Sequence, residues 1–266
     1  VACTDISPDW ASQRIKGLSL MSAVVNAFKP QGGDEQIKTL ITHFRYPRLG
    51  PGMMWEAAAA KIRAQNNHIE LNADVTELYY LEDEQTWDIG YRLGDRIKHV
   101  KAKHVLSSMP IRALIPAIKN TMPEDVLRAA AALKYRDFLT VALMINNQGS
   151  FDDNWIYIHE PNVKVGRIQN FRSWSPELIP DESKNCYGLE YFCFEGDGLW
   201  TSKDSDLIEL AKKEMCQIGL VKADEIIDGC VVRQPKAYPV YDEGYKQNVT
   251  IIREYLKQQY PSLHLV

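Results

Sequence analysis

The sequence predicts a mixed protein of the α/β and α+β classes, with helices and more than one sheet. In its first half, a helix ending near Gln65 leads into a strand over residues 68–80 and an antiparallel hairpin that turns at Gly94 and Asp95. Farther along, alternating apolar and polar residues predict several more strands, and an amphipathic helix follows them. These observations indicate two lobes built from different parts of the chain.

Two helices are expected in the first 30 residues. Ser7 is a suitable N-cap, Pro8 suits the first turn, and Gly17 can end the helix that they open. A second helix over residues 18–28 would end before Pro30, which cannot continue it. We expect these helices to be an appendage to the segment that follows rather than part of it.

The second half of the sequence predicts a sheet of at least four strands. A helix over residues 123–132 comes first. Alternation of apolar and polar residues then marks four strands, at residues 138–145, 155–159, 163–171 and 187–194. A helix over residues 204–217, ended by Gly219, carries its apolar residues on one side, so we expect it to cover one face of this sheet.

Composition and charge exclude several classes of partner. The 266 residues can bury a core, and acidic and basic side chains nearly cancel to a net charge of −4. No run of like charges indicates a charged binding surface for nucleic acid or for an anionic membrane. The longest apolar stretches, such as residues 139–145, are too short to cross a bilayer. We therefore expect no nucleic-acid partner, no transmembrane segment and a cytoplasmic location.

The cysteines indicate reduced thiols, and we expect no metal site. Five cysteines are scattered without CxxC spacing: Cys3, Cys186, Cys193, Cys216 and Cys230. An odd, unclustered set of this kind is typical of a cytosolic protein, and it lacks the spacing of zinc ligands.

One glycine motif is better interpreted as a loop than as a dinucleotide site. Gly196 and Gly198 follow a strand and precede a helix, but the third glycine of the GxGxxG pattern is absent, and Trp200 would collide with a pyrophosphate. No other GxGxxG occurs in the sequence.

The sequence does not identify catalytic residues. Glu190 and Glu195 flank an aromatic strand, but alternation places them on opposite faces, so a catalytic pair is not expected. His159 has no serine or cysteine at a recognisable spacing, so a hydrolytic triad finds no support.

The most informative segment is the turn before the first central helix. It combines Arg45 and Arg48 with Pro47, Gly50 and Gly52. Backbone N–H groups and the dipole at the start of a helix favour anions or electron-rich rings. Surface cations in ion pairs are the alternative interpretation of both arginines.

This turn, the helix, strand and hairpin after it, and the strand end at residues 104–110 together resemble a known family. In this order they are similar to the middle of the FAD domain in the flavin-dependent amine oxidase superfamily, which includes protoporphyrinogen oxidase, the carotenoid desaturases and UDP-galactopyranose mutase. The resemblance implies part of a FAD/NAD(P)-binding domain interleaved with a substrate domain built on a mixed sheet covered by helices. It divides the chain into substrate-domain helices, a middle FAD-domain segment, the substrate domain and a return segment, at residues 1–43, 44–115, 116–234 and 235–266.

The family also places glycine-rich flavin segments before and after the part that resembles this sequence. We therefore expect the sequence to be a fragment that is inactive alone and binds FAD weakly or not at all. Surfaces that the missing segments would cover are expected to promote self-association.

The resemblance implies roles for several residues. The turn would lie beside the isoalloxazine ring, the backbone of Val75 would pair with the adenine, and Ser108 would lie near the flavin. The implied cofactor-binding residues are Arg48, Gly50, Gly52, Met53, Val75 and Ser108. Pro51 departs from the commonest family pattern between the two glycines. Packing is the alternative for Met53 and Val75.

The expected substrate-binding residues combine cations, an amide and aromatic rings. They are Arg167, Asn170, Tyr191, Tyr238 and Tyr241. Such a mix suits a polar or phosphorylated small molecule such as a sugar nucleotide, although it also suits a half-exposed sheet or a domain seam.

Three functions remain open. The first is a FAD-dependent oxidoreductase that transfers hydride or electrons to the flavin. The second is a flavin-dependent isomerase of the UDP-galactopyranose mutase type. The third is a non-catalytic module that binds a carbohydrate or a protein.

Overall fold

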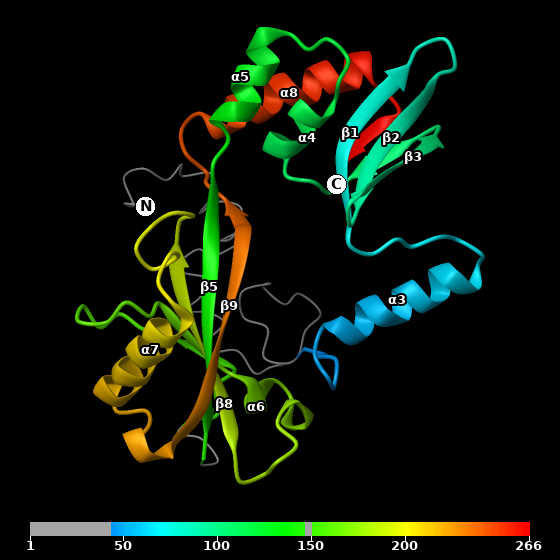
Figure 1. Ribbon diagram of the computed structural model, residues 1–266. Helices are drawn as coiled ribbons and strands as arrows, with labels where there is room; N and C mark the ends of the chain where they lie inside the picture. Colours follow the sequence, from blue (N-terminus) through cyan, green and yellow to red (C-terminus); the bar gives the residue numbers. More distant parts are fainter. Residues whose placement is uncertain (1–43, 147–150) are drawn as a thin grey trace, which may run out of the picture. The chain divides into compact units, whose positions relative to one another are not determined.

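The computed structural model describes residues 44–146 and 151–266, and it contains helices and several separate sheets. The described chain belongs to two compact units, and each is considered by itself. Unit 1 includes Asp74–Leu133 and Val240–Val266, and unit 2 includes Tyr46–Ala73 and Lys134–Pro239 (Figure 1). The two helices expected near the N-terminus lie outside the described residues.

Unit 1 contains a three-stranded sheet in the order β1-β2-β3, formed by β1 (Ala73–Leu81), β2 (Thr86–Leu93) and β3 (Arg96–Ala102). Leu93 pairs with Arg96 across the expected Gly94–Asp95 turn, where Gly94 has φ 59°. Glycine accepts this left-handed φ without steric cost, so the turn can be tight.

A second, parallel pair in unit 1 joins β4 (Val105–Ser107) to β10 (Leu263–Leu265). Three helices accompany these strands: α4 (Ile111–Ala117), α5 (Glu124–Ala132) and α8 (Tyr245–Gln259). The unit has its own core, in which the indole of Trp87 packs against the rings of Tyr80 and Tyr260 and donates a hydrogen bond to Ser262 Oγ at 2.9 Å.

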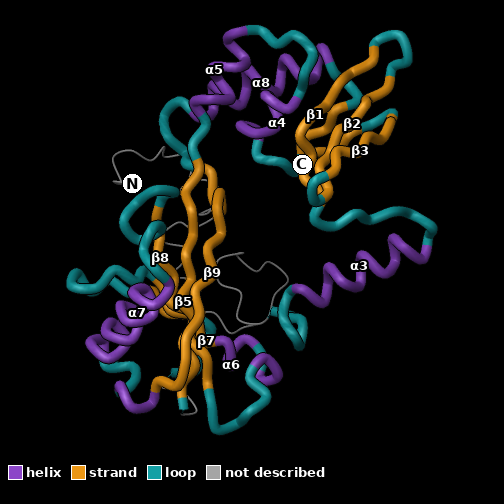
Figure 2. The backbone as a smooth tube through the Cα atoms, viewed as in Figure 1, coloured by secondary structure: helices purple, strands orange, loops and turns teal. Residues whose placement is uncertain are grey.

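Unit 2 is built on a five-stranded antiparallel sheet in the order β6-β7-β8-β5-β9. Its strands are β6 (Trp155–Tyr157), β7 (Arg167–Asn170), β8 (Asn185–Cys193), β5 (Tyr135–Ile145) and β9 (Ile226–Pro239). The long strands β5 and β9 run side by side (Figure 2).

One face of this sheet is covered by α7 (Asp204–Ile218), as the sequence predicts. Leu207, Ala211 and Met215 of the helix are fully buried in the same core as Leu139 and Val141 of β5. The helix ends at Gly219, which has the expected left-handed φ of 81°.

The remaining helices of unit 2 are short, apart from α3 (Gly52–Ala64), which has no buried residue. They are α6 (Phe171–Trp174), η2 (Pro176–Leu178) and η3 (Ala223–Glu225). None of the helices in the described part of the chain has the length and hydrophobicity needed to cross a membrane.

Several element boundaries differ from the sequence prediction. The strand expected from residue 68 begins at Ala73, because Leu71 is exposed and Asn72 has a left-handed φ of 58°. The strand expected over residues 163–171 is only Arg167–Asn170, and Phe171 opens a helix.

Among the described elements that were not expected from the sequence, three are longer than four residues. They are α4, α8 and the 14-residue strand β9. No residue of β9 is fully buried, so this strand lacks the strong apolar period on which prediction depends. Helix α8 does have an apolar side, which buries Ile252 and Leu256, and the sequence analysis overlooked it.

Candidate functional site

The candidate site lies on the face of the five-stranded sheet opposite α7, here called the outer face. Because side chains alternate along a strand and paired residues share a face, the register assigns this face directly. It carries Phe138 and Thr140 of β5, Gly188, Glu190 and Phe192 of β8, Arg167 and Gln169 of β7, and Trp155 and Tyr157 of β6.

A buried carboxylate organises the centre of this face. Glu190 is only 1% exposed, and its two oxygens accept hydrogen bonds from Nε of Arg167 and from the side-chain amide of Gln169. The carbonyl oxygen of Gln169 in turn accepts a hydrogen bond from Nε1 of Trp174 at 2.8 Å. Arg167, Glu190, Gln169 and Trp174 therefore form one connected polar chain, which fixes the orientation of each member.

The guanidinium of Arg167 is held from two sides. Burial works to lower its pKa, but the hydrogen bonds and charges of Glu190 and, to a smaller extent, Tyr157 together outweigh burial, and the pKa is raised. Its Cζ also lies 5.8 Å from the ring centroid of Tyr157. A charged, oriented arginine on an aromatic ring is suited to binding a carboxylate or phosphate through its remaining N–H groups.

Aromatic rings border the same chain of hydrogen bonds. Trp155 and Trp174 are stacked, with ring centroids 5.3 Å apart and an angle of 15° between planes. The ring of Tyr46 lies 4.9 Å from Trp174 on the same cluster. Trp155 remains partly exposed, so this cluster offers a flat aromatic surface beside Arg167.

The turn singled out in the sequence is attached to this region. Arg48 forms an ion pair with Glu177 of η2, and a Cβ added to Gly50 would lie 3.6 Å from Leu178. Gly50 has φ 92°, which favours glycine, and its N–H closes the turn on Pro47 O at 2.9 Å. The turn is thus shaped by glycine and anchored to unit 2 by side chains.

The structure divides the implied cofactor residues between the units. Arg48, Gly50, Gly52 and Met53 lie in this turn, and Sδ of Met53 accepts a hydrogen bond from the Leu49 N–H. Val75 and Ser108 lie in unit 1, where Val75 packs against the core and Ser108 is exposed. Their roles in FAD binding stay predictions.

The turn itself fits the approach of a flat ring. A Cβ added to Gly52 would meet no atom within 4 Å, so the backbone there is open, and Gly50 provides the sharp change of direction before the helix. Arg48 forms an exposed ion pair with Glu177, which is the alternative interpretation left open by the sequence, and its role in cofactor binding stays a prediction.

The five expected substrate residues lie in different environments. Arg167 is on the outer face, whereas Asn170 is buried and donates a hydrogen bond to Phe151 O at 2.6 Å. Tyr191 is fully buried in the core beside α7, where its hydroxyl donates to Glu214 Oε2 at 2.9 Å. Its position in this core gives it no accessible surface for a substrate in the described structure.

The two remaining tyrosines belong to different units. Tyr238 lies near the end of β9, is 40% exposed and makes an edge contact with the ring of Phe138 at 6.4 Å. Tyr241 belongs to unit 1 and makes an edge contact with Tyr245 at 4.8 Å. The structure therefore places four of the five residues in one sheet, but Asn170 and Tyr191 are buried there and Tyr241 lies in unit 1.

Sequence reasoning missed the charged residues at the bulged end of β5. The register of β5 with β9 shifts between Arg136 and Phe138, and the intervening Asp137 is almost fully buried. Asp137 Oδ1 accepts the N–H of Lys236 at 2.7 Å, and its other oxygen accepts the N–H of Glu195. The signal available in the sequence was an adjacent Arg–Asp pair at the start of an apolar strand.

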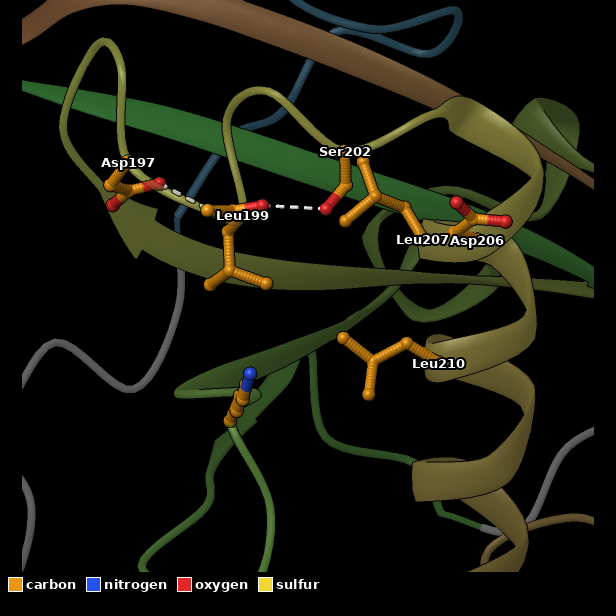
Figure 3. Close-up of a pocket in the computed structure, with 8 residues that line it drawn as sticks. Asp197, Leu199, Ser202, Asp206, Leu207 and Leu210 are labelled. Carbon is orange, nitrogen blue, oxygen red and sulfur yellow. Dashed lines mark hydrogen bonds between the residues drawn. The ribbon is translucent and has the colours of Figure 1, made fainter.

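A pocket of about 420 Å³ lies on the other side of the sheet, at the start of α7 (Figure 3). Asp197 Oδ1 accepts the N–H of Leu199 at 3.0 Å and that of Trp200 at 2.8 Å, so it caps the turn. Asp197 and Asp206 both line the pocket, with Lys164 as its lining cation. Two carboxylates disfavour a pyrophosphate, in agreement with our interpretation of this glycine motif as a structural loop.

Within the residues that the structure describes, no three histidine, cysteine, aspartate or glutamate side chains are grouped so that they could hold a metal ion.

Solved structures share this fold. The structure of reduced UDP-galactopyranose mutase matches 99% of this chain and 55% of its own, with a TM-score of 0.76 and 16% sequence identity. A proposed protoporphyrinogen oxidase from Exiguobacterium matches 82% of this chain and 46% of its own, with a TM-score of 0.64 and 15% identity. A CLA-producing fatty acid isomerase from P. acnes also matches 82% of this chain and 46% of its own, with a TM-score of 0.52 and 12% identity.

These likenesses confirm the expected resemblance at the level of the fold. Two of the three names belong to the superfamily that the sequence resembles, but identities of 12–16% concern the fold alone. This chain spans about half the length of each of the three proteins. No protein-family model matches the sequence, and no curated protein does.

Proposed function

We propose that this chain is part of a flavin-dependent enzyme of the oxidoreductase and isomerase class, and that the outer face of its five-stranded sheet binds the substrate. The fold likeness to reduced UDP-galactopyranose mutase over 99% of the chain carries this proposal. The oriented Arg167 and the aromatic rings beside it support a polar, ring-containing substrate.

Among the open alternatives, the mutase type is the most consistent with the outer face. A sugar nucleotide contains a diphosphate and a flat base. Arg167 would bind the phosphate oxygens through the N–H groups that Glu190 leaves available, and the exposed side of Trp155 would support a ring. An amine, porphyrinogen or polyene would suit a more apolar surface than the one around Glu190, Gln169 and Arg167.

FAD is the cofactor implied by the family resemblance. The open backbone at Gly50 and Gly52 would lie beside the isoalloxazine ring, the backbone of Val75 would bind the adenine, and Ser108 would lie near the flavin. When bound, the flavin supplies hydride or electron acceptance in an oxidoreductase, or a nucleophile in an isomerase. The protein contributes placement of the substrate and the charge of Arg167.

Calorimetric titration with UDP-galactose tests the substrate proposal directly. We expect saturable binding, with UDP competing for it, and a loss of at least about tenfold in affinity in Arg167→Lys, equivalent to about 1.4 kcal/mol. Lysine keeps the charge opposite Glu190 but lacks the planar fork. Arg253→Lys makes the same replacement on the exposed side of α8 and should leave the affinity unchanged.

Other outcomes of this titration would favour the other functions. Binding of simple sugars with no competition by UDP would favour a non-catalytic carbohydrate module. No binding of UDP or UDP-galactose, together with binding of an amine, porphyrin or polyene, would favour the oxidoreductase branch.

A further inference from the structure

We propose that the bulged end of the five-stranded sheet, around Arg136, is a binding site for a carboxylate attached to an apolar body. The site consists of Arg136, Phe192, Phe194 and Tyr238, all of which belong to unit 2. It is separate from the hydrogen-bonded chain at Arg167 and does not depend on the function proposed above.

The first observation is the unusual environment of Arg136. Its Cζ lies 5.0 Å from the ring centroid of Phe192 and 5.9 Å from that of Phe194. Its Nε is buried without a hydrogen-bond partner. Buried donors are nearly always paired in folded proteins, so an unpaired guanidinium nitrogen between aromatic rings indicates a missing acceptor.

The other arginines near the sheet show that this is exceptional. Arg167 and Arg233 pair with carboxylates, and Arg172 donates to backbone carbonyls. No carboxylate in the described ranges forms an ion pair with Arg136. In the described part of the chain, the rings of Phe192 and Phe194 are therefore the recorded contacts of the Arg136 guanidinium.

The second observation explains why the adjacent Asp137 forms no ion pair with Arg136. Both oxygens of Asp137 accept backbone N–H groups, one from Lys236 at 2.7 Å and the other from Glu195. The backbone of Lys236 is held there with a left-handed φ of 54°, a conformation that is uncommon for residues other than glycine.

The bulge thus has a defined consequence for Arg136. Asp137 ties the end of β8 to β9, and the register shift beside it places Arg136 over Phe192. Bulges often redirect a side chain next to a functional site, and strained backbone tends to occur at such sites. The structure therefore holds Arg136 in place without using its charge.

The surroundings indicate the class of ligand. Phe192, Phe194 and Tyr238 remain 37%, 39% and 40% exposed, and the ring of Phe138 lies 5.9 Å from Phe192 and 6.4 Å from Tyr238. These rings provide an apolar surface for the body of a ligand. A single guanidinium balances one negative charge, and its planar fork matches a carboxylate. A phosphate dianion would carry a second, unbalanced charge onto an apolar surface, which desolvation disfavours.

Benzoate is a suitable probe, with inorganic phosphate as the comparison. In NMR titrations of the whole chain, we expect benzoate to give saturable shifts of the Arg136 Nε–Hε signal and of the Phe192, Phe194 and Tyr238 rings. Phosphate should bind at least about tenfold more weakly, because it lacks an apolar body and carries more charge.

Two variants test whether Arg136 contributes to benzoate binding. Arg136→Gln should weaken benzoate binding at least about tenfold, because it removes the cation and the bidentate fork. Lys213→Gln removes one exposed positive charge from α7, on the other side of the sheet, and should leave the affinity unchanged. The direct NMR shifts in the parent protein keep the test valid even if Arg136→Gln folds poorly.

Three results would overturn the proposal. They are the absence of saturable shifts at Arg136, equal benzoate affinity in the parent and in folded Arg136→Gln, and phosphate binding as tight as benzoate binding. The first two would leave Arg136 as a packing residue of the sheet, and the third would assign the site to a different anion.

Discussion

Glu190 and Arg167 lie directly opposite one another on β8 and β7, and their side chains form an ion pair in which the carboxylate is almost completely buried. A buried carboxylate is tolerated only when its charge is balanced and its oxygens are hydrogen-bonded. Arg167 and Gln169 meet both conditions. The pair therefore links the stability of the sheet to the charge proposed to bind substrate.

Glu190→Gln should destabilise the protein by about 2 kcal/mol. The substitution removes the charge opposite the partly buried Arg167, which retains some solvent contact, so the cost falls below that of breaking a fully buried pair. Urea unfolding followed by circular dichroism measures this change. Glu177→Gln removes the carboxylate of the exposed Arg48 pair and should cost well under about 1 kcal/mol. Equal effects in the two variants would mean that burial does not strengthen the Glu190 pair.

Gly188→Ala should destabilise the outer face by about 1–3 kcal/mol through overpacking. A Cβ at this position would lie 2.9 Å from Cζ of Phe171 and 3.4 Å from Cγ2 of Thr140, so the phenyl ring must move. Gly198→Ala is a matched control in the same unit, because a Cβ there meets no atom within 4 Å. Thermal unfolding of both variants tests the packing. An unchanged midpoint temperature in Gly188→Ala would show that the ring of Phe171 can move aside without cost.

The thiols of Cys186 and Cys193 should resist alkylation while the protein is folded. Burial raises the pKa of both to about 11, so the reactive thiolate is scarce near neutral pH, whereas Cys230 is exposed. Of these three cysteines, iodoacetamide labelling at pH 8, followed by peptide mass spectrometry, should modify Cys230 first. In urea the three rates should become similar, and early modification of Cys193 in the folded protein would contradict its burial.

The same thiols predict a loss of stability at alkaline pH. In the unfolded chain a cysteine loses its proton near pH 8.5, whereas the folded protein keeps both protons until about pH 11. The unfolded state therefore binds fewer protons between these values, and the free energy of unfolding should fall as the pH rises through this window. Replacing Cys186 and Cys193 with alanine should flatten that part of the profile, measured by urea unfolding at each pH.

Local patterns were sufficient to predict much of the fold. Alternation along β5 identified a strand with one buried face. Gly219 was predicted to end α7, and in the structure it does so with a left-handed φ. The edge strand β9 escaped prediction because none of its side chains is fully buried, and so no apolar period distinguishes it.

The candidate site was less accessible to sequence reasoning because its members depend on distant partners. The sequence analysis considered Glu190 only as half of a catalytic pair, and its hydrogen bond with Gln169 exists only once β7 and β8 pair. Asp137 acquires its role from backbone N–H groups 58 and 99 residues away, which no local pattern reveals. Burial of Tyr191 against α7 likewise depends on the position of Glu214 in tertiary structure.

Gly52→Val should remove FAD binding by this chain without unfolding it. A side chain at Gly52 meets no atom within 4 Å, so the fold can accept valine, but a flat ring lying against this backbone would be blocked. Quenching of FAD fluorescence measures binding, which we expect to be weak in the parent, and circular dichroism checks the fold. Gly198→Val adds the same side chain at another open glycine of unit 2 and should leave FAD binding unchanged.

Arg48→Ala separates the two interpretations of the same turn. Both partners of the Arg48–Glu177 pair are largely exposed, so its loss should change the free energy of unfolding by well under about 1 kcal/mol. If the turn lies beside the flavin, removing this cation should still weaken FAD binding, because a nearby positive charge favours an anionic ligand. Unchanged FAD affinity in both Arg48→Ala and Gly52→Val would exclude the turn from the cofactor site, and its glycines would then serve only to start α3.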